Sequence, residues 1–109
     1  MQIALKKQIE VYVESNGQSP FINWLEALDP PVKFRVKERL DRVALGNLGD
    51  YKQINKDIFE LRLTVGAGYR IYFYEEDSKI ILLLSGGNKS TQKKDIKKAM
   101  SYLNDYLTE

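Results

Sequence analysis

The earliest pattern along the chain is an alternation of apolar residues with other residues near the N-terminus. Ile9, Val11 and Val13 alternate with polar, charged or tyrosine side chains. A period of two is typical of a β-strand with one buried face. Asn16-Gly17 interrupts the alternation, so a first strand is expected to end there.

The next pattern has helical spacing. Ser19-Pro20 is a typical helix start, because a serine side chain accepts hydrogen bonds from free amides and proline is tolerated at the first helical position. Apolar residues then form one stripe at i, i+3, i+4 and i+7: Phe21, Trp24, Leu25 and Leu28. A short helix is therefore expected, ending at Asp29-Pro30.

A second helix is predicted from Pro31, with Gly46 as a left-handed C-terminal cap. Its expected core-facing stripe consists of Val32, Val36, Leu40 and Val43. Arg35, Arg39 and Arg42 fall on another side of this helix. The two helices are expected to form an antiparallel hairpin.

The rest of the chain contains strands and one more helix. Residues 46–57 have no period and are expected to form a loop. Three strands are predicted over 58–65, 69–75 and 79–85, and the Gly-Ala-Gly segment 66–68 joins the first two in a hairpin.

This hairpin is expected to place Val65 opposite Tyr69, with charged and aromatic side chains on the face away from the core. These are Glu60, Arg62, Arg70, Tyr72 and Tyr74. The run 80–84 is apolar throughout, as in a central strand covered on both faces. A final helix is expected from Ser90 or Thr91. Its predicted inner stripe consists of Ile96, Ala99, Met100, Leu103 and Leu107.

The predicted order of elements is βααβββα, which is an α+β fold. At 109 residues, the chain is expected to form one domain over 1–109. It has no Cys and no His. This excludes disulfides, thiolate zinc sites and nucleophiles activated by histidine, and leaves acid–base chemistry to carboxylates, Lys, Arg or Tyr. No stretch approaches about 18 apolar residues, so we expect a cytoplasmic protein without membrane contact.

The net charge of +2 does not by itself indicate nucleic-acid binding. The distribution of basic residues along the chain is more informative. Basic residues on three elements are expected to converge: Arg62 and Arg70 on the hairpin, Lys52 and Lys56 on the loop, and Lys89, Lys93 and Lys94 around the last helix start. Arginine suits phosphate because its planar guanidinium donates two parallel hydrogen bonds. The alternative is a cross-strand salt-bridge cluster of Glu60, Arg62 and Arg70 on a solvated face.

The start of the last helix has an unfavourable charge arrangement. Lys93 and Lys94 are expected in its first turn, where each typically costs about 0.3–1 kcal/mol against the helix dipole. An anion bound at the free amides would make the same charges favourable. The alternative is that solvent and salt screen the penalty and the lysines have no such role.

Aromatic and acidic residues complete the candidate chemistry. Tyr72 and Tyr74 are candidates for stacking on unpaired bases, whereas Tyr69 is expected in the core; aromatic residues are also ordinary strand formers. Asp50 and Glu60 are the acids expected near the basic group. Either can act as a general base or neutralise an arginine.

Several segments carry a family resemblance. They are GNLGDYK (46–52), FELR (59–62), GAGYRIYF (66–73), LLSGGNKSTQ (83–92) and KDI (94–96). In this order, and together with Trp24-Leu25 and Arg39-Leu40, they resemble the RelE/ParE toxin superfamily. Within it, the chain is most similar to the HigB-like, phage-derived addiction module killer branch.

The resemblance implies a RelE-like fold, in which two N-terminal helices pack on a small antiparallel sheet. It implies a toxin that a cognate antitoxin neutralises, and we expect the antitoxin to be a helix-turn-helix protein from the adjacent gene. Many members cut mRNA on the ribosome without a metal or other cofactor. In that reaction the 2′-hydroxyl attacks the adjacent phosphorus, and a 2′,3′-cyclic phosphate forms.

The resemblance also implies roles for particular residues. Arg70 corresponds to the catalytic strand arginine of the family and Arg62 to a phosphate-binding arginine. Lys89 falls where members have a basic residue or His after the last strand. RNA-cleaving relatives often use a His or Tyr near the C-terminus for proton transfer, but Ile96 occupies the place of that Tyr here, so the general acid is not identified.

The leading prediction is a ribosome-dependent mRNA endoribonuclease whose partners are the antitoxin, the ribosome and mRNA. Its expected catalytic residues are Arg70, Arg62, Glu60 and Lys89. Its expected RNA-binding residues are Lys52, Lys56, Lys93, Lys94 and Tyr72. Two alternatives stay open, because one fold supports several functions. They are a non-enzymatic, ParE-like inhibitor of DNA gyrase and an inactive homologue that acts in antitoxin-bound autorepression.

Overall fold

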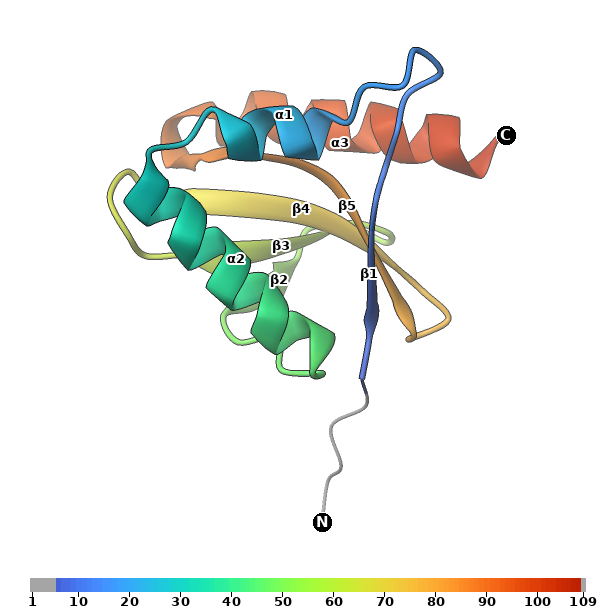
Figure 1. Cartoon of the computed structure of the whole chain (residues 1–109). Helices are drawn as coiled ribbons and strands as arrows, with labels where there is room; N and C mark the ends of the chain where they lie inside the picture. The colour runs from blue at the N-terminus through green and yellow to red at the C-terminus, as the bar shows by residue number, and fades with distance from the viewer. Residues whose placement is uncertain (1–5, 109) are drawn as a thin grey trace.

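The chain folds into a five-stranded sheet with helices on both faces (Figure 1). The computed structural model describes residues 6–108. In chain order the elements are β1 (Gln8–Val11), α1 (Pro20–Glu26), α2 (Pro30–Ala44), β2 (Tyr51–Gln53), β3 (Phe59–Leu63), β4 (Tyr69–Glu76), β5 (Ile80–Asn88), a 3-10 turn (Lys89–Thr91) and α3 (Gln92–Leu107). The predicted α+β class is confirmed.

The sheet is mixed, with the strands in the order β1-β5-β4-β3-β2. β1 pairs in parallel with β5, so that Gln8 lies opposite Ile80, while the other neighbouring strands are antiparallel. A parallel pair needs a long connection, which the intervening helices and strands supply. The expectation of a wholly antiparallel sheet is therefore wrong for β1, because its alternation does not specify its partner.

β1 is also shorter than the segment of alternating apolar residues that predicted it. β1 ends at Val11, and the amide of Tyr12 donates a last hydrogen bond to the carbonyl oxygen of Leu83 at 2.9 Å. Tyr12 is buried in the core beneath α3, whereas Val13 is 45% exposed. The predicted burial of Val13 is therefore wrong, because the chain leaves the sheet before reaching it.

The loop predicted over 46–57 contains the short edge strand β2. Three residues are too few to show a period of two, and all of them are exposed. β2 pairs with β3 and places Lys52 directly opposite Glu60. The prediction of a loop is therefore wrong at Tyr51–Gln53. This strand places Lys52 on the same face of the sheet as Glu60.

The hairpin of β3 and β4 has a different register from the predicted one. Leu63, rather than Val65, lies opposite Tyr69. The residues between the strands form a turn in which the amide of Gly68 donates to the carbonyl oxygen of Val65 at 3.1 Å. Gly66 and Gly68 have φ values of 55° and 76°, a left-handed conformation that favours glycine. A shift of two residues keeps each side chain on its predicted face but changes its neighbours.

The helix starts match the predictions closely. Ser19 caps α1 by accepting a hydrogen bond from the amide of Ile22 at 3.3 Å, and Pro20 is the first helical residue. α2 begins at Pro30, one residue before the expected start, and Gly46 follows it with a left-handed φ of 92°. In Figure 1, α1 and α2 form a V over one face of the sheet, a more open arrangement than the expected hairpin.

Each face of the sheet has its own buried cluster. α1 and α2 cover one face, where the cluster includes Phe21, Leu25, Val36, Val43, Leu61 and Ile71. α3 covers the opposite face, where the cluster includes Tyr12, Ile58, Tyr72, Leu84, Ala99 and Leu103. The run 80–84 contributes to both clusters, which confirms the prediction of a central strand covered on two sides.

Two predicted helix stripes are only partly correct. Arg39 is only 9% exposed and lies on the buried side of α2, with Val36 and Val43. Met100 and Leu107 were expected inside but are 49% and 52% exposed. α3 contacts the sheet along a narrow stripe, so the apolar residues at the edge of that stripe stay accessible.

The end of β5 lies close to both helix layers. A Cβ atom at Gly86 would lie 2.3 Å from the Trp24 ring, and one at Gly87 would lie 1.8 Å from the Asp95 carboxylate. Side chains larger than hydrogen do not fit at these distances, so the two glycines allow α1 and α3 to approach. Because Gly87 lies opposite Arg70 in the sheet, the first turn of α3 lies beside Arg70.

Candidate functional site

Two arginines and one glutamate gather on the α3-facing side of the sheet. Arg62 of β3 lies directly opposite Arg70 of β4, and Glu60 lies opposite Tyr72. Residues opposite each other in a strand pair share a face, as do residues two apart on one strand. The structure therefore brings together three of the residues predicted to be catalytic, although their predicted register was different.

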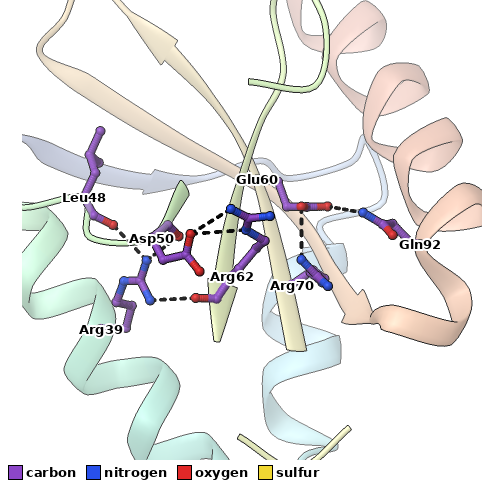
Figure 2. Close-up of polar contacts among 7 residues, drawn as sticks. All are labelled: Arg39, Leu48, Asp50, Glu60, Arg62, Arg70 and Gln92. Carbon is purple, nitrogen blue, oxygen red and sulfur yellow. Dashed lines mark hydrogen bonds and ion pairs between the residues drawn. The ribbon is translucent and has the colours of Figure 1, made fainter. Parts of the chain in front are cut away.

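Glu60 connects Arg70 to the beginning of α3 (Figure 2). The Arg70 Nη1 donates to Glu60 Oε1 at 3.3 Å, and the Gln92 Nε2 donates to Glu60 Oε2 at 2.8 Å. The side chain of Glu60 is 1% exposed and that of Arg70 is 14% exposed. A carboxylate buried to this extent needs such partners, since an unpaired buried charge is strongly unfavourable.

Arg62 is paired with a second acid, Asp50, at the edge of the sheet. Its Nη2 and Nε both donate to Asp50 Oδ1, at 2.8 and 3.3 Å. Its backbone amide also donates to the carbonyl oxygen of Asp50 at 3.0 Å. The two side chains are 37% and 51% exposed, so this pair faces solvent, in contrast to the buried pair of Arg70 with Glu60.

Arg39 organises the segment that carries Asp50, a role that the sequence prediction missed. Its Nη1 donates to the carbonyl oxygen of Arg62 at 2.8 Å. Its Nη2 donates to the carbonyl oxygens of Leu48 and Asp50, at 2.9 and 2.7 Å. Figure 2 shows this guanidinium between α2, the 48–50 segment and β3. Burial lowers the pKa of Arg39, and the nearby charge of Arg42 acts in the same direction.

A signal for the burial of Arg39 was present in the sequence. Arg39 lies three residues after Val36 and four before Val43, which places it on the same side of a helix as both. Gly49 allows the backbone of the 48–50 segment to lie close to Arg39, because a Cβ atom there would lie 3.1 Å from the Arg39 guanidinium. The sequence pattern did not show which carbonyl groups would accept these hydrogen bonds.

The four charged groups of this site form two neighbouring ion pairs. Arg62 pairs with Asp50, and Arg70 pairs with Glu60. The alternative prediction of a salt-bridge cluster of Glu60, Arg62 and Arg70 therefore agrees with the structure only for Arg70 and Glu60. Arg62 pairs with Asp50 instead, and Glu60 is buried rather than solvated. Charge neutrality allows two arginines to lie side by side, since like charges directly opposite each other are otherwise destabilising.

The predicted lysines lie around this site in different positions. Lys52 is exposed and lies opposite Glu60 on the edge strand. Lys89 is exposed in the 3-10 turn after β5, and its Cβ would be 3.6 Å from a Cβ at Gly68. Lys93 and Lys94 are exposed in the first turn of α3, as predicted.

Lys56 belongs to a different region. It lines a hollow with Met100, Leu103 and Leu107 from the C-terminal half of α3. Gln92, which contacts Glu60, is at the other end of this helix, and eight residues of helix span about 12 Å. The structure therefore does not bring Lys56 to the two arginines with the other predicted lysines.

The start of α3 already contains a negative charge. Asp95 lies in the same first turn as Lys93 and Lys94, is 8% exposed, and accepts a hydrogen bond from the Thr91 hydroxyl. Asn88 caps the preceding 3-10 turn by accepting from the Ser90 amide at 2.9 Å. A carboxylate here offsets part of the unfavourable interaction between the lysines and the helix dipole.

Tyr72 cannot stack on a base in this structure, because it is completely buried. The prediction that Tyr72 contacts RNA is therefore wrong for this conformation; alternation does not show that α3 covers this part of the face. Burial raises the pKa of Tyr72, and the negative charge of Glu60 raises it further. Tyr69 packs in the core against Trp24, with ring centroids 6.4 Å apart, as predicted, and Tyr74 is half-buried beneath α3.

Two further properties of residues 6–108 bear on function. No group of three or more His, Cys, Asp or Glu side chains in this part of the chain is arranged to hold a metal ion. No helix within it is long and apolar enough to span a membrane.

The chain is similar to a known protein family and to a bacterial relative. A family model described as "Phage derived protein Gp49-like (DUF891)" matches residues 23–103. An uncharacterized protein of Haemophilus influenzae is 45% identical over 80 residues, which cover 72% of this chain and 81% of that protein. The matched residues include Arg39, Arg62 and Arg70 and most of α3.

Proposed function

Because this chain belongs to the Gp49-like family of phage-derived proteins, which is associated with addiction-module killer toxins, we propose that it is the toxin of a type II toxin–antitoxin module and cleaves mRNA on the ribosome. This proposal includes the finer relationship to HigB-like members of the RelE/ParE superfamily. A cognate antitoxin, the ribosome and mRNA are its partners, and it acts in the cytoplasm.

The observation that carries the proposal is the cross-strand pair of Arg62 and Arg70. Guanidinium groups bind phosphate with two parallel hydrogen bonds and stay ionised at neutral pH. Two of them side by side on one sheet face match the needs of phosphoryl transfer, in which charge accumulates on the non-bridging oxygens of the reacting phosphate.

The two arginines have different roles in this proposal. Arg70 is 14% exposed and its partner Glu60 is 1% exposed, so Arg70 is a fixed charge beside the reacting phosphate. Arg62 and Asp50 are 37% and 51% exposed, so a substrate phosphate can replace Asp50 as the partner of Arg62. Arg70 therefore stabilises the transition state, and Arg62 binds and orients the phosphate.

The same contacts distinguish the two acids. Both oxygens of Glu60 accept hydrogen bonds, one from Arg70 and one from Gln92. Glu60 therefore acts as a positioning residue for Arg70. Asp50 is accessible, and when phosphate displaces it from Arg62 its carboxylate is free to accept a proton. Asp50 is thus the general base in this proposal.

The proposed step is an intramolecular transesterification of RNA. Asp50 takes the proton of the 2′-hydroxyl, the 2′-oxygen forms a bond to the adjacent phosphorus, and the bond from phosphorus to the 5′-oxygen breaks. The leaving 5′-oxygen takes a proton from solvent. The products are a 2′,3′-cyclic phosphate and a 5′-hydroxyl end. Lys52, Lys89, Lys93 and Lys94 supply the surrounding positive charge for neighbouring phosphates.

The test is regulated expression of the chain in a bacterial host, followed by mapping of mRNA 5′ ends. Growth arrest with new 5′-hydroxyl ends inside translated codons is the expected result. Arrest with intact mRNA and inhibited DNA supercoiling would overturn the nuclease function in favour of gyrase inhibition. Normal growth with the folded chain present would overturn toxicity and favour a role in antitoxin-bound autorepression.

A further inference from the structure

A second surface feature lies away from the arginines, between the turn joining β2 to β3 and the C-terminal half of α3. It is a hollow of about 520 Å³. Its apolar lining consists of Ile58, Met100, Leu103 and Leu107. Ile58 and Leu103 are buried at 1% and 4% exposure, whereas Met100 and Leu107 are 49% and 52% exposed. We call this feature the α3 groove.

The wall of the groove opposite α3 is well ordered by its own hydrogen bonds. The side-chain oxygen of Asn55 accepts from the amides of Asp57 and Ile58, at 3.0 and 2.9 Å. The amide of Ile54 donates to the carbonyl oxygen of Ile58 at 2.8 Å. The groove is therefore a preformed depression, which keeps the entropy cost of binding low.

Two exposed apolar side chains along the groove are not explained by the packing of the core. Met100 and Leu107 lie seven residues apart on one side of α3 and do not contribute to either core cluster. Exposed apolar residues next to an apolar depression are typical of interaction sites. Methionine adapts its shape to a partner, so this arrangement suits the apolar face of a helical segment, which presents side chains at i, i+3 and i+4.

The charges beside the groove indicate the chemistry of that segment. Lys97 is exposed one turn before Met100 on the same side of α3, and Lys56 is exposed on the opposite wall. Among the described residues of the lining, Asp57 is the only acid. An acidic segment would find two lysines beside its apolar contacts, which favours fast association and the correct register.

From the apolar lining and the flanking lysines, we propose that the α3 groove binds an acidic, amphipathic helical segment of a partner protein. Under the proposed function, on which this identification of the partner rests, that protein is the cognate antitoxin. Its apolar side chains contact Met100, Leu103 and Leu107, and its carboxylates face Lys56 and Lys97. A protein is favoured over RNA because the lining, as far as residues 6–108 form it, has no aromatic ring for a base to stack on.

The groove and the arginine site are separate parts of one face. Glu60, the partner of Arg70, accepts a hydrogen bond from Gln92 at the beginning of α3, while the groove lies along the C-terminal half of this helix. A partner bound in the groove is therefore held by residues that take no part in the proposed reaction. Changes in the groove should affect partner binding without affecting toxicity.

The test uses the full chain and the purified product of the reading frame adjacent to its gene, with the dissociation constant measured by calorimetry. Met100→Glu and Leu107→Glu each place a carboxylate at a half-exposed position, so folding is expected to be preserved. Each is expected to weaken binding at least 10-fold. Lys97→Glu should weaken binding 5- to 10-fold, mainly through slower association. The toxicity of all three variants, measured as growth arrest without the partner, should stay unchanged.

Matched controls are available on α2 and at the residue that follows it. Phe34 and Leu45 are 65% and 61% exposed, and their substitution by Glu should leave the dissociation constant within threefold. Loss of binding in these controls but not in Met100→Glu would overturn the groove assignment, as would no binding of the adjacent gene product to the unaltered chain. Reduced affinity of Lys97→Glu for a single-stranded RNA 12-mer, with unchanged binding by Met100→Glu, would instead assign this surface to RNA.

The outcomes separate this inference from the proposed function. A chain that causes no growth arrest but loses its partner through Met100→Glu would contradict the toxin assignment and support the groove. A toxic chain whose partner binding does not respond to any groove variant would contradict only the groove.

Discussion

Arg62 and Arg70 lie directly opposite each other on β3 and β4, yet each contacts a different carboxylate. Two like charges in a directly opposed pair are destabilising unless other charges compensate. Asp50 supplies that compensation at the exposed edge, and Glu60 supplies it in the interior. The site therefore combines one exchangeable ion pair with one fixed ion pair, and the predictions below test this asymmetry.

The fixed ion pair predicts a strict requirement for the guanidinium of Arg70. Arg70→Lys keeps a positive charge beside Glu60 but loses the planar arrangement of donors. We expect cleavage by this variant to fall about 100- to 1,000-fold, as for loss of one preorganised donor to a transition-state oxyanion. The measurement is the appearance of new mRNA 5′ ends after induction, with circular dichroism as a check of folding.

Arg35→Lys is the matched control for this substitution, because Arg35 is exposed on α2. It should retain full toxicity. Unchanged cleavage by Arg70→Lys at normal protein levels would show that Arg70 does not stabilise the transition state.

The exchangeable ion pair predicts that the carboxylate of Asp50 is needed for the reaction but not for the fold. Arg39 contacts the backbone carbonyl oxygen of Asp50 rather than its side chain, so Asp50→Asn leaves this anchor in place. Loss of a general base typically reduces the rate about 100- to 10,000-fold, and we expect a similar loss of cleavage. Single-turnover cleavage of ribosome-bound mRNA is the measurement.

Asp41→Asn, at an exposed position on α2, serves as the control for charge removal. A fully active Asp50→Asn variant would reduce Asp50 to a counter-ion of Arg62. In that case proton acceptance would have to be assigned elsewhere.

The buried guanidinium of Arg39 predicts a large effect on stability. Arg39→Met removes the guanidinium donor from the carbonyl oxygens of Leu48, Asp50 and Arg62. The carbonyl oxygen of Asp50 keeps its hydrogen bond from the Arg62 amide. Hydrogen bonds involving a charged group typically contribute about 1.5–3 kcal/mol, so we expect the free energy of unfolding to fall by about 2–4 kcal/mol. Urea unfolding measures this change.

Arg35→Met, which removes an exposed arginine from the same helix, should change the free energy of unfolding by less than about 0.5 kcal/mol. An equally small effect of Arg39→Met would mean that solvent replaces the three hydrogen bonds at little cost. The 48–50 segment would then not depend on Arg39.

The burial of Tyr72 predicts a specific loss of stability at alkaline pH. Burial, together with Glu60, raises the pKa of Tyr72 above its ordinary value of about 10. The unfolded chain therefore loses the phenolic proton at a lower pH than the folded chain does. The stabilisation is fully present below pH 10 and declines as pH rises above it, by up to about 1.4 kcal/mol per pH unit.

Urea unfolding of the unaltered chain and of Tyr72→Phe between pH 7 and 11.5 checks the direction of this pH dependence of stability. The variant should lose less stability than the unaltered chain above pH 10. Tyr51→Phe, at a ring that is 45% exposed, controls for the removal of a tyrosine. Parallel curves for the unaltered chain and Tyr72→Phe would contradict the raised pKa.

The local sequence determined the elements whose signals depend on neighbouring residues. Ser19-Pro20 and Pro30-Pro31 mark the two helix starts, and the apolar run 80–84 marks the central strand, because capping, proline geometry and side-chain period act over a few residues. Arg62 and Arg70 could likewise be placed on one sheet face. The same alternation also placed Glu60 and Tyr72 there, without showing that both are buried.

The tertiary structure decided what depends on segments far apart in the chain. The parallel pairing of β1 with β5 and the alignment of Arg62 with Arg70 require strand partners and a turn geometry that no local period specifies. Arg39 is buried because carbonyl groups of the 48–50 segment and of β3 surround it. Met100 and Leu107 are exposed because α3 packs along a narrower stripe than its apolar residues indicate. Such contacts arise only when separate elements pack together, and the proposed chemistry and partner binding both depend on them.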